Sequence, residues 1–322
     1  MAKNSVCDLF GIEYPILQGG MLWIASVELA AAVSNAGALG ILSPYAGMEE
    51  NGDPLQNLRL QIRRTKDRTP KPFGVNIPLD VPAGGLLIDV LLQEQVKIAV
   101  TAAGDPKLYT ELFHSAGVRV AHVVSSVIQA RRAASCGVDV VIVEGMEAGG
   151  RIGRDELSLM SLVPLVVDAI SVPVIAAGGI VDGRGLAAAM ALGAQGVQLG
   201  TRFVATEECI AHPNYKQAII DARDSDTIVT RRAHVPTRSL KCGFARDLAV
   251  LEKSGAPADI IQTFIGRGRG RQAQVEGDLE NGDAYAGSTV GLIKEILPAA
   301  EVIAILIKGL QMIPDSGFRI PD

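Results

Sequence analysis

The stretch VPVIAAGGIVDGRGLAAAMALGAQGVQLGTRF, residues 172–203, contains two consecutive strand-to-loop units. The β-branched run 172–176 predicts a short strand that stops at the Ala-Gly-Gly segment 177–179, and an Ala/Leu-rich helix follows. A second run, 196–199, stops at Gly200-Thr201. Glycines at the carboxyl ends of neighbouring parallel strands leave N–H groups bare for an anion, and the amino terminus of a following helix adds positive charge. The stretch therefore predicts a phosphate site, the alternative being that its glycines only make tight turns and close helix packing.

Strand-like runs alternate with helical ones from the start of the chain. Eight such runs precede a helical segment, at 15–18, 39–42, 73–76, 97–101, 119–123, 138–143, 172–176 and 196–199. Eight βα units predict an α/β fold of the (β/α)8 TIM barrel type, whose functional residues lie at the carboxyl ends of the strands. The phosphate site follows the last two strands, where such barrels bind phosphate.

The alternation breaks after the eighth strand. Charged helical pieces and the run GRGRGR at 266–271 do not continue it. This predicts a small, mostly helical cap inserted after strand eight, followed by a helix over 290–310 that packs back on the barrel. We expect a barrel over 1–205, a cap over 206–284 and a helical return over 285–322.

Composition excludes several classes of protein. The 322 residues are 48% hydrophobic with 35 glycines, which suits buried parallel strands covered by helices. A formal charge of −5 gives no electrostatic case for nucleic acid, and GRGRGR lacks interleaved aromatic residues. The four cysteines show no metal-binding spacing, the amino terminus lacks an apolar signal core, and no uncharged apolar run reaches membrane-spanning length. We expect a cytoplasmic protein with no metal, membrane or nucleic-acid partner.

The residues at the strand ends form the candidate site. They are Gly19, Gly20, Met21, Asn76, Thr101, Ala103, Gly104, His122, Ser125, Glu144 to Gly150 with Arg151, Ala177, Gly178, Gly179, Gly200 and Thr201. Few of these can act as acid, base or nucleophile. Many glycines, a phosphate site and little catalytic machinery are typical of a site whose bound cofactor carries the chemistry.

Five motifs in order resemble the nitronate monooxygenase family, which includes flavin-type enoyl-acyl-carrier-protein reductases and some NAD(P)H:quinone reductases. They are PILQGGM at 15–21, FGVN at 73–76, EGMEAGG at 144–150, AAGGI at 176–180 and VQLGTRF at 197–203, joined by AHPNYK at 211–216. The resemblance covers almost the whole chain and implies an FMN-bound barrel and a homodimer. FGVNIPL, with Pro78 and no histidine, is closer to the enoyl-reductase branch.

The resemblance also implies roles for individual residues. Gly20 and Met21 would lie against the isoalloxazine, Asn76 would hydrogen-bond its edge, and Gly19 belongs to the same cofactor-binding set. Gly149 and Gly150 would let the backbone approach the ring, and Thr101 and Glu144 complete the expected flavin-binding set. Ala177, Gly178, Gly179, Gly200 and Thr201 would hold the phosphate.

One position departs from the family pattern. Most members have histidine after EGMEAGG, but this chain has Arg151. Arginine stays protonated at ordinary pH, so it cannot abstract a proton as histidine does. Arg151 is therefore the candidate catalytic residue, in the role of binding an anionic group or stabilising negative charge. The alternative is that it is a surface loop residue. None of the four histidines is a better candidate. His122 lies on a strand and is expected to be a core residue, and those at 114, 212 and 234 lie on a helix or in the cap.

We expect NAD(P)H-dependent reduction of an activated double bond, such as an enoyl thioester, or of a quinone. Two alternatives stay open: oxidation of alkyl nitronates with O2, and a non-catalytic flavin-binding sensor. A nucleotide-binding barrel of the IMP dehydrogenase type is disfavoured because the loop 144–150 has no cysteine.

Overall fold

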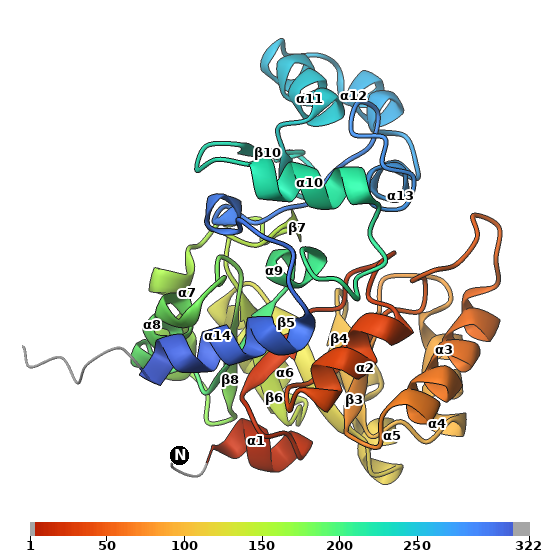
Figure 1. Ribbon diagram of the computed structural model, residues 1–322, viewed down its shortest axis with the longest axis vertical. Coiled ribbons are helices and arrows are strands. Elements are labelled where there is room, and N and C mark those ends of the chain that lie inside the picture. The colour runs from red at the N-terminus through yellow and green to blue at the C-terminus, as the bar shows by residue number, and fades with distance from the viewer. Residues whose placement is uncertain (1–3, 312–322) are drawn as a thin grey trace, which may run out of the picture.

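Eight parallel strands form the centre of the computed structural model, which describes residues 4–311 (Figure 1). They are β1 (Ile16–Gln18), β2 (Gly40–Leu42), β3 (Phe73–Pro78), β4 (Ile98–Ala102), β5 (Arg119–Val124), β6 (Val140–Glu144), β8 (Val174–Ala177) and β9 (Gly196–Leu199). Their order is β1-β9-β8-β6-β5-β4-β3-β2, and a parallel bridge between Leu17 and Leu39 joins β1 to the start of β2. The TIM barrel predicted from the eight runs is confirmed.

Helices cover the outside of this barrel. They are α2 (Val27–Asn35), α3 (Pro54–Arg68), α4 (Gly84–Gln93), the 3-10 turn η1 (Pro106–Leu108), α5 (Thr110–Ser115), α6 (Val127–Ser135), α7 (Leu159–Val167), α8 (Gly183–Ala191), α9 (Thr201–Val204) and α14 (Ala299–Gln311). The short α1 (Ser5–Phe10) lies at the end of the barrel opposite the cap (Figure 1). α14 packs against both α8 and α2, so it takes the place of the helix that follows the eighth strand.

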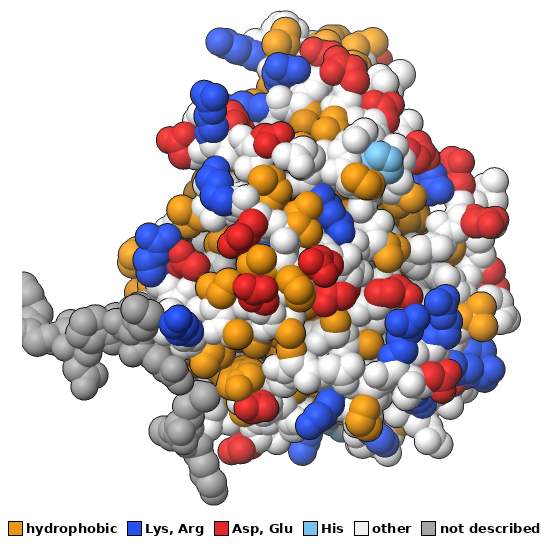
Figure 2. All heavy atoms as spheres, viewed as in Figure 1, with side chains coloured by type: hydrophobic (Ala, Val, Ile, Leu, Met, Phe, Trp, Pro, Cys, Tyr) orange, Lys and Arg blue, Asp and Glu red, His pale blue; other side chains and the backbone are white. Residues whose placement is uncertain are grey.

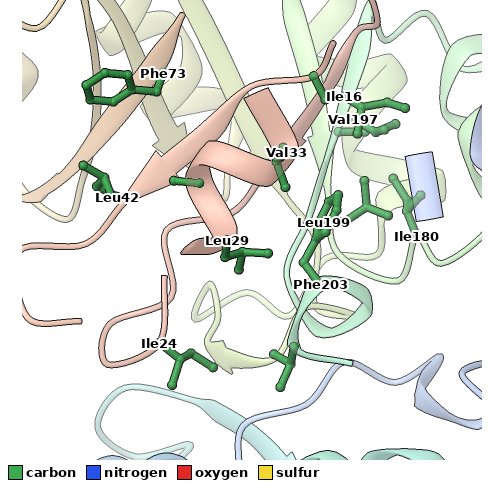
Figure 3. Close-up of a cluster of buried hydrophobic side chains, with 14 of the residues drawn as sticks. Ile16, Ile24, Leu29, Val33, Leu42, Phe73, Ile180, Val197, Leu199 and Phe203 are labelled. Atoms are coloured by element: carbon green, nitrogen blue, oxygen red, sulfur yellow. The ribbon is translucent and has the colours of Figure 1, made fainter. Parts of the chain in front are cut away.

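Two buried layers show which way each strand residue points. Alternate residues, among them Leu17, Val100, Ile142 and Ile175, form a cluster inside the barrel. The intervening residues belong to a larger cluster between strands and helices, whose Val197, Leu199 and Phe203 are drawn in Figure 3. Because side chains alternate along a strand, this parity places every residue at the strand ends on one face or the other.

The contact between α8 and α14 explains one glycine of the opening motif. A Cβ on Gly183 would lie 2.5 Å from the backbone of Gly309, so the two helices touch backbone to backbone. The predicted helix over 290–310 was wrong at its start: only a 3-10 turn, η2 (Val290–Leu292), precedes α14. Pro298 disfavours a helical conformation before it, and the extended segment instead bonds to the barrel through Leu297.

The segment between α9 and α14 stands over the carboxyl ends of the strands (Figure 1). It contains α10 (Pro213–Asp221), β10 (Thr227–Thr230), β11 (Thr237–Leu240), α11 (Gly243–Lys253), α12 (Ala258–Ile265) and α13 (Arg269–Gln274). It is mostly helical, as predicted, but β10 and β11 pair antiparallel and β11 also pairs with β7 (Gly150–Arg151). The loop after β6 is therefore part of the cap's sheet. The boundaries 205, 206–284 and 285 stay a prediction, and residues 1–3 and 312–322 of the outer units lie outside the described residues.

Buried charge holds the cap together. Asp283, 1% exposed, pairs with Arg231 at 2.5 Å and accepts a hydrogen bond from Ser239. The run GRGRGR has a structural use in the same region. Arg269 donates to the last carbonyls of α12 and lies over the Phe244 ring, and Arg271 pairs with Glu276.

Figure 2 shows lysines and arginines gathered over α3. Ion pairs of its arginines engage two carboxylates: Arg59 and Arg63 bind Glu94, and Arg64 and Arg68 lie beside Glu28. None of the helices in residues 4–311 combines the length and apolar character needed to cross a membrane.

Candidate active site

Three polar side chains point inward at the barrel mouth, the end where the carboxyl ends of the strands meet. They are Asn76 on β3, Glu144 at the end of β6 and Gln198 on β9, and we call them the mouth triad. Their neighbours Val75, Val143 and Val197 belong to the outer cluster, which fixes the triad on the inner face. Sequence reasoning missed Gln198, although its position between two outward-facing apolar residues of VQLG was a usable signal.

The mouth triad has no hydrogen-bond partner among residues 4–311. The Gln198 carbonyl oxygen is buried and unpaired. The pKa of the Glu144 carboxyl is raised to about 8 by burial. Buried polar groups are nearly always satisfied in folded proteins. The buried Gln198 oxygen, beside two partly buried polar side chains that make no hydrogen bond within residues 4–311, therefore indicates a site for a polar ligand.

Backbone N–H groups form a second cluster beside the triad. Those of Gly178, Gly179, Gly200 and Thr201 find no acceptor within the described part of the chain, and we call them the anion cradle. Gly178 and Gly179 have φ values of 107° and 67°, which L residues rarely adopt. A Cβ on Gly200 would meet no atom within 4 Å, so open space lies in front of that residue.

A third loop, residues 286–289, lies beside the cradle. The N–H of Gly287 donates to the Thr201 hydroxyl at 3.0 Å, and a Cβ on Gly179 would lie 3.7 Å from the Thr289 side chain. The N–H of Ser288 donates to the Glu147 carbonyl at 2.9 Å. The sequence prediction did not include this loop, although its run of small residues, Ala-Gly-Ser-Thr, resembles the other glycine turns.

Packing accounts for other glycines of the predicted set. A Cβ on Gly20 would lie 2.4 Å from that of Asn76, so the turn after β1 lies directly against this member of the mouth triad. A Cβ on Gly19 would lie 3.5 Å from the Gln198 side chain. Gly149 abuts the backbone of Ala286, and Gly150, with φ 85°, passes over Tyr285. Met21 is half-buried and packs against the outer core cluster.

The amino terminus of α8, which we expected to add positive charge to the phosphate site, is capped by a side chain of the same loop. The Asp182 side chain accepts from the N–H groups of Arg184 and Gly185, so it caps that helix itself. Gly200 instead precedes the short α9, which has no side-chain cap.

Thr101 and His122 face away from the mouth. Val100 and Ala121, one residue earlier, belong to the inner cluster, so Thr101 and His122 lie on the outer face of their strands. There the Thr101 hydroxyl bonds to His122 Nδ1 at 2.8 Å. The Thr101 side chain therefore lies away from the barrel mouth. Burial lowers the pKa of the His122 imidazole to about 4.

The other histidines have local partners or cap positions. His114 pairs with Asp139, and His212 accepts from the Asn214 N–H at the start of α10. His234 lies between β10 and β11.

Arg151 lies on β7 at the edge of the cap's sheet. Its side chain is 69% exposed and its guanidinium pairs with Asp80, in the loop after β3, at 3.1 Å. The pair joins the cap to the barrel rim. Arg151 thus stands outside the mouth triad, and its positive charge already has a carboxylate neighbour.

The barrel, the anion cradle and the mouth triad together define a site for a phosphorylated, hydrogen-bonding cofactor. The chain belongs to the nitronate monooxygenase family, which it matches over residues 3–85 and 86–309. The family is generally flavin-dependent, and the chain is an oxidoreductase like its named relatives.

Three relatives show its range. FabK from Thermotoga maritima, an enoyl-ACP reductase II, is 42% identical over 97% of both chains with a TM-score of 0.89. A 5-hydroxy-7a-methyl-1-oxo-octahydro-1H-indene-4-carboxyl-CoA dehydrogenase from Rhodococcus jostii is 39% identical over 76% of this chain and 68% of its own. A probable nitronate monooxygenase from Staphylococcus aureus is 32% identical over 71% of this chain and 75% of its own.

Proposed function

We propose that the chain binds FMN at the barrel mouth and uses NAD(P)H to reduce the activated double bond of an enoyl thioester. The observation that carries the proposal is made within residues 4–311: four N–H groups without an acceptor lie at the same end of the barrel as three polar side chains without a hydrogen-bond partner. The cradle would hold the single phosphate, and the triad would meet the donors and acceptors of the ring. When bound, the flavin supplies hydride transfer between the nicotinamide and the substrate.

The residues of the chain bind and orient rather than react. The turn after β1 contacts Asn76 and would fix that amide against the ring edge. The cap covers the mouth through β7 and would limit water at the reacting carbons. Arg151 cannot act as a base, but its exposed guanidinium could receive an anionic part of the nicotinamide or the thioester if Asp80 yields it.

Thioester chemistry is favoured over nitronate oxidation for two reasons. The relatives with the higher identities, FabK and the indene-carboxyl-CoA dehydrogenase, are named for acyl-carrier or CoA chemistry. The position of the family histidine is occupied by a cation that cannot take a proton. A homodimer, implied by the family resemblance, stays a prediction.

The test compares the activities of one FMN-loaded enzyme preparation on several substrates. We expect oxidation of NADH or NADPH when crotonyl-CoA or an enoyl-acyl carrier protein is added, followed by the loss of absorbance of the reduced nicotinamide. Turnover of alkyl nitronates with O2 and no nicotinamide would favour the nitronate alternative. No bleaching of the flavin by either nicotinamide would favour a sensor, and protein that fails to bind FMN would overturn the proposal.

A further inference from the structure

A groove with a volume of about 590 Å³ lies at the end of the barrel opposite the mouth. Its walls are α1 and the loops that lead into β3, β4 and β5. α1 closes one side, because a Cβ on Gly11 at its end would lie 3.5 Å from the Pro72 side chain. A Cβ on Gly117, before β5, would meet no atom within 4 Å, so open space lies beside that loop. The volume falls in the range of sites for small molecules.

The floor of the groove is apolar. Phe10, Phe73 and Ile98 line it and are buried. Phe10 and Ile98 belong to the cluster inside the barrel, and Phe73 belongs to the outer cluster. These side chains are therefore held by the core, and the floor is a fixed part of the barrel.

Cations surround this floor. Lys71 stands two residues before β3, Lys97 directly precedes β4, and Arg119 is the first residue of β5. Because these strands are neighbours in the sheet, their three cations lie along one edge of the groove. Lys66 on α3 is the fourth cation, and it donates to the Glu94 carbonyl. None of the residues that line the groove is acidic, although the chain has 35 acidic residues against 30 basic ones.

Two of these cations are free to meet a ligand. Arg119 is paired with the Asp139 carboxylate at 2.8 Å. Lys71 and Lys97 are exposed, and neither takes part in an ion pair within residues 4–311. Their charges are therefore available beside the apolar floor.

We propose that this groove binds a fatty-acid anion, with its chain on the apolar floor and its carboxylate between Lys71 and Lys97. An apolar floor edged by unpaired cations is complementary to a ligand with an apolar chain and one negative end. A membrane surface fits less well, because Phe10, Phe73 and Ile98 are buried at the bottom of a groove and do not project from it. The inference goes beyond the proposed function and does not depend on it, since the groove and the mouth lie at opposite ends of the barrel.

The test measures binding of laurate to the full chain by calorimetry, with FMN present and below the concentration at which laurate forms micelles. Lys71→Glu/Lys97→Glu reverses both free charges and should raise the Kd for laurate by about tenfold or more. Lys71→Gln/Lys97→Gln, which only removes the charges, should give a smaller rise. The matched control is Lys253→Glu/Lys308→Glu, which makes the same change of net charge at exposed positions on α11 and α14 and should keep the wild-type Kd.

Two further measurements separate charge from apolar contact. Monolaurin, the neutral glycerol ester of the same chain, should bind wild type about tenfold more weakly than laurate does. Raising the salt concentration from about 0.05 M to about 0.5 M should weaken laurate binding to wild type more than to the doubly reversed variant.

A loss of laurate affinity in the groove variants alone, together with weak binding of monolaurin, supports the inference. It is overturned if wild type does not bind laurate, if the groove and control variants bind laurate equally, or if monolaurin binds as tightly as laurate. Binding of wild type to phosphatidylglycerol vesicles without binding of laurate would identify this face as a membrane contact and would also overturn it. None of these results depends on turnover of an enoyl thioester, so the proposed function is tested separately.

Discussion

Gly200 offers a clean test of the anion cradle. Its φ is −104°, and an added Cβ would meet no heavy atom within 4 Å, so Gly200→Ala should change the free energy of unfolding of the apoprotein by no more than about 0.5 kcal/mol. The methyl group would occupy the space in front of the cradle. It should push a bound phosphate off the N–H groups of Gly200 and Thr201.

The expected loss follows from those contacts. A hydrogen bond to a charged group contributes about 1.5–3 kcal/mol, so the Kd for FMN should rise about tenfold to 150-fold. Gly200→Asp adds negative charge at the same place and should abolish measurable binding. Gly178→Asp is a poorer test, because its Cβ would lie 2.9 Å from the Ala148 nitrogen at a φ of 107° and would distort the loop with or without phosphate.

The assay is titration of apoprotein with FMN, followed by quenching of flavin fluorescence. Gly85→Ala on α4 is the control, since its Cβ would make only an ordinary contact at 3.6 Å with the Tyr109 hydroxyl. If Gly200→Ala and Gly200→Asp both bind FMN as wild type does, the phosphate is held elsewhere and the reasoning fails.

Three further predictions concern the rim, the cap and the outer layer. Arg151→Ala should weaken the binding of an anionic acceptor or of the nicotinamide by about 1.5–3 kcal/mol, measured as KM or Kd. Asp80→Asn frees the guanidinium and should not weaken that binding. Equal KM and Kd values for both variants and wild type would mean that the pair is only a surface contact. Asp283→Ala leaves Arg231 nearly buried without its partner and should cost about 3–5 kcal/mol, measured by urea unfolding; a loss below about 1 kcal/mol would contradict this. Burial holds His122 neutral, with a folded pKa of about 4 against the ordinary 6.5. Between pH 6.5 and 4 the unfolded chain therefore binds a proton that the folded chain does not, and the free energy of unfolding should fall by about 3 kcal/mol. His122→Gln should lose that part of the acid sensitivity in urea unfolding, and an unchanged pH dependence would count against the reasoning.

Part of the site followed from local sequence. The glycines at 178, 179 and 200 could be placed because a turn with bare N–H groups at a strand end is a local feature. Asn76 and Glu144 could be placed at strand ends for the same reason. Their flavin-binding roles, and those of the other predicted site residues, stay predictions.

Other site features depend on contacts between distant segments. Thr101 was predicted at the site because it ends a strand, but the closed barrel turns its side chain outward to His122. Gly183, in the same motif as the glycine turns, is needed for the backbone contact with Gly309 of α14. Neither outcome could be deduced from a single strand–turn–helix unit.

The sequence alone determined the eight βα units, the cap after the eighth strand and the two glycine turns, because periodicity and glycine placement act over a few residues. Only the tertiary structure decided that the 286–289 loop returns to Thr201 across 86 residues, that Arg151 pairs with Asp80, and that Gln198 points to the same inner face as Asn76 and Glu144. Barrel closure fixes which alternate residues point inward, and the inserted cap sets which loops meet. Both are properties of the assembled chain rather than of any one segment.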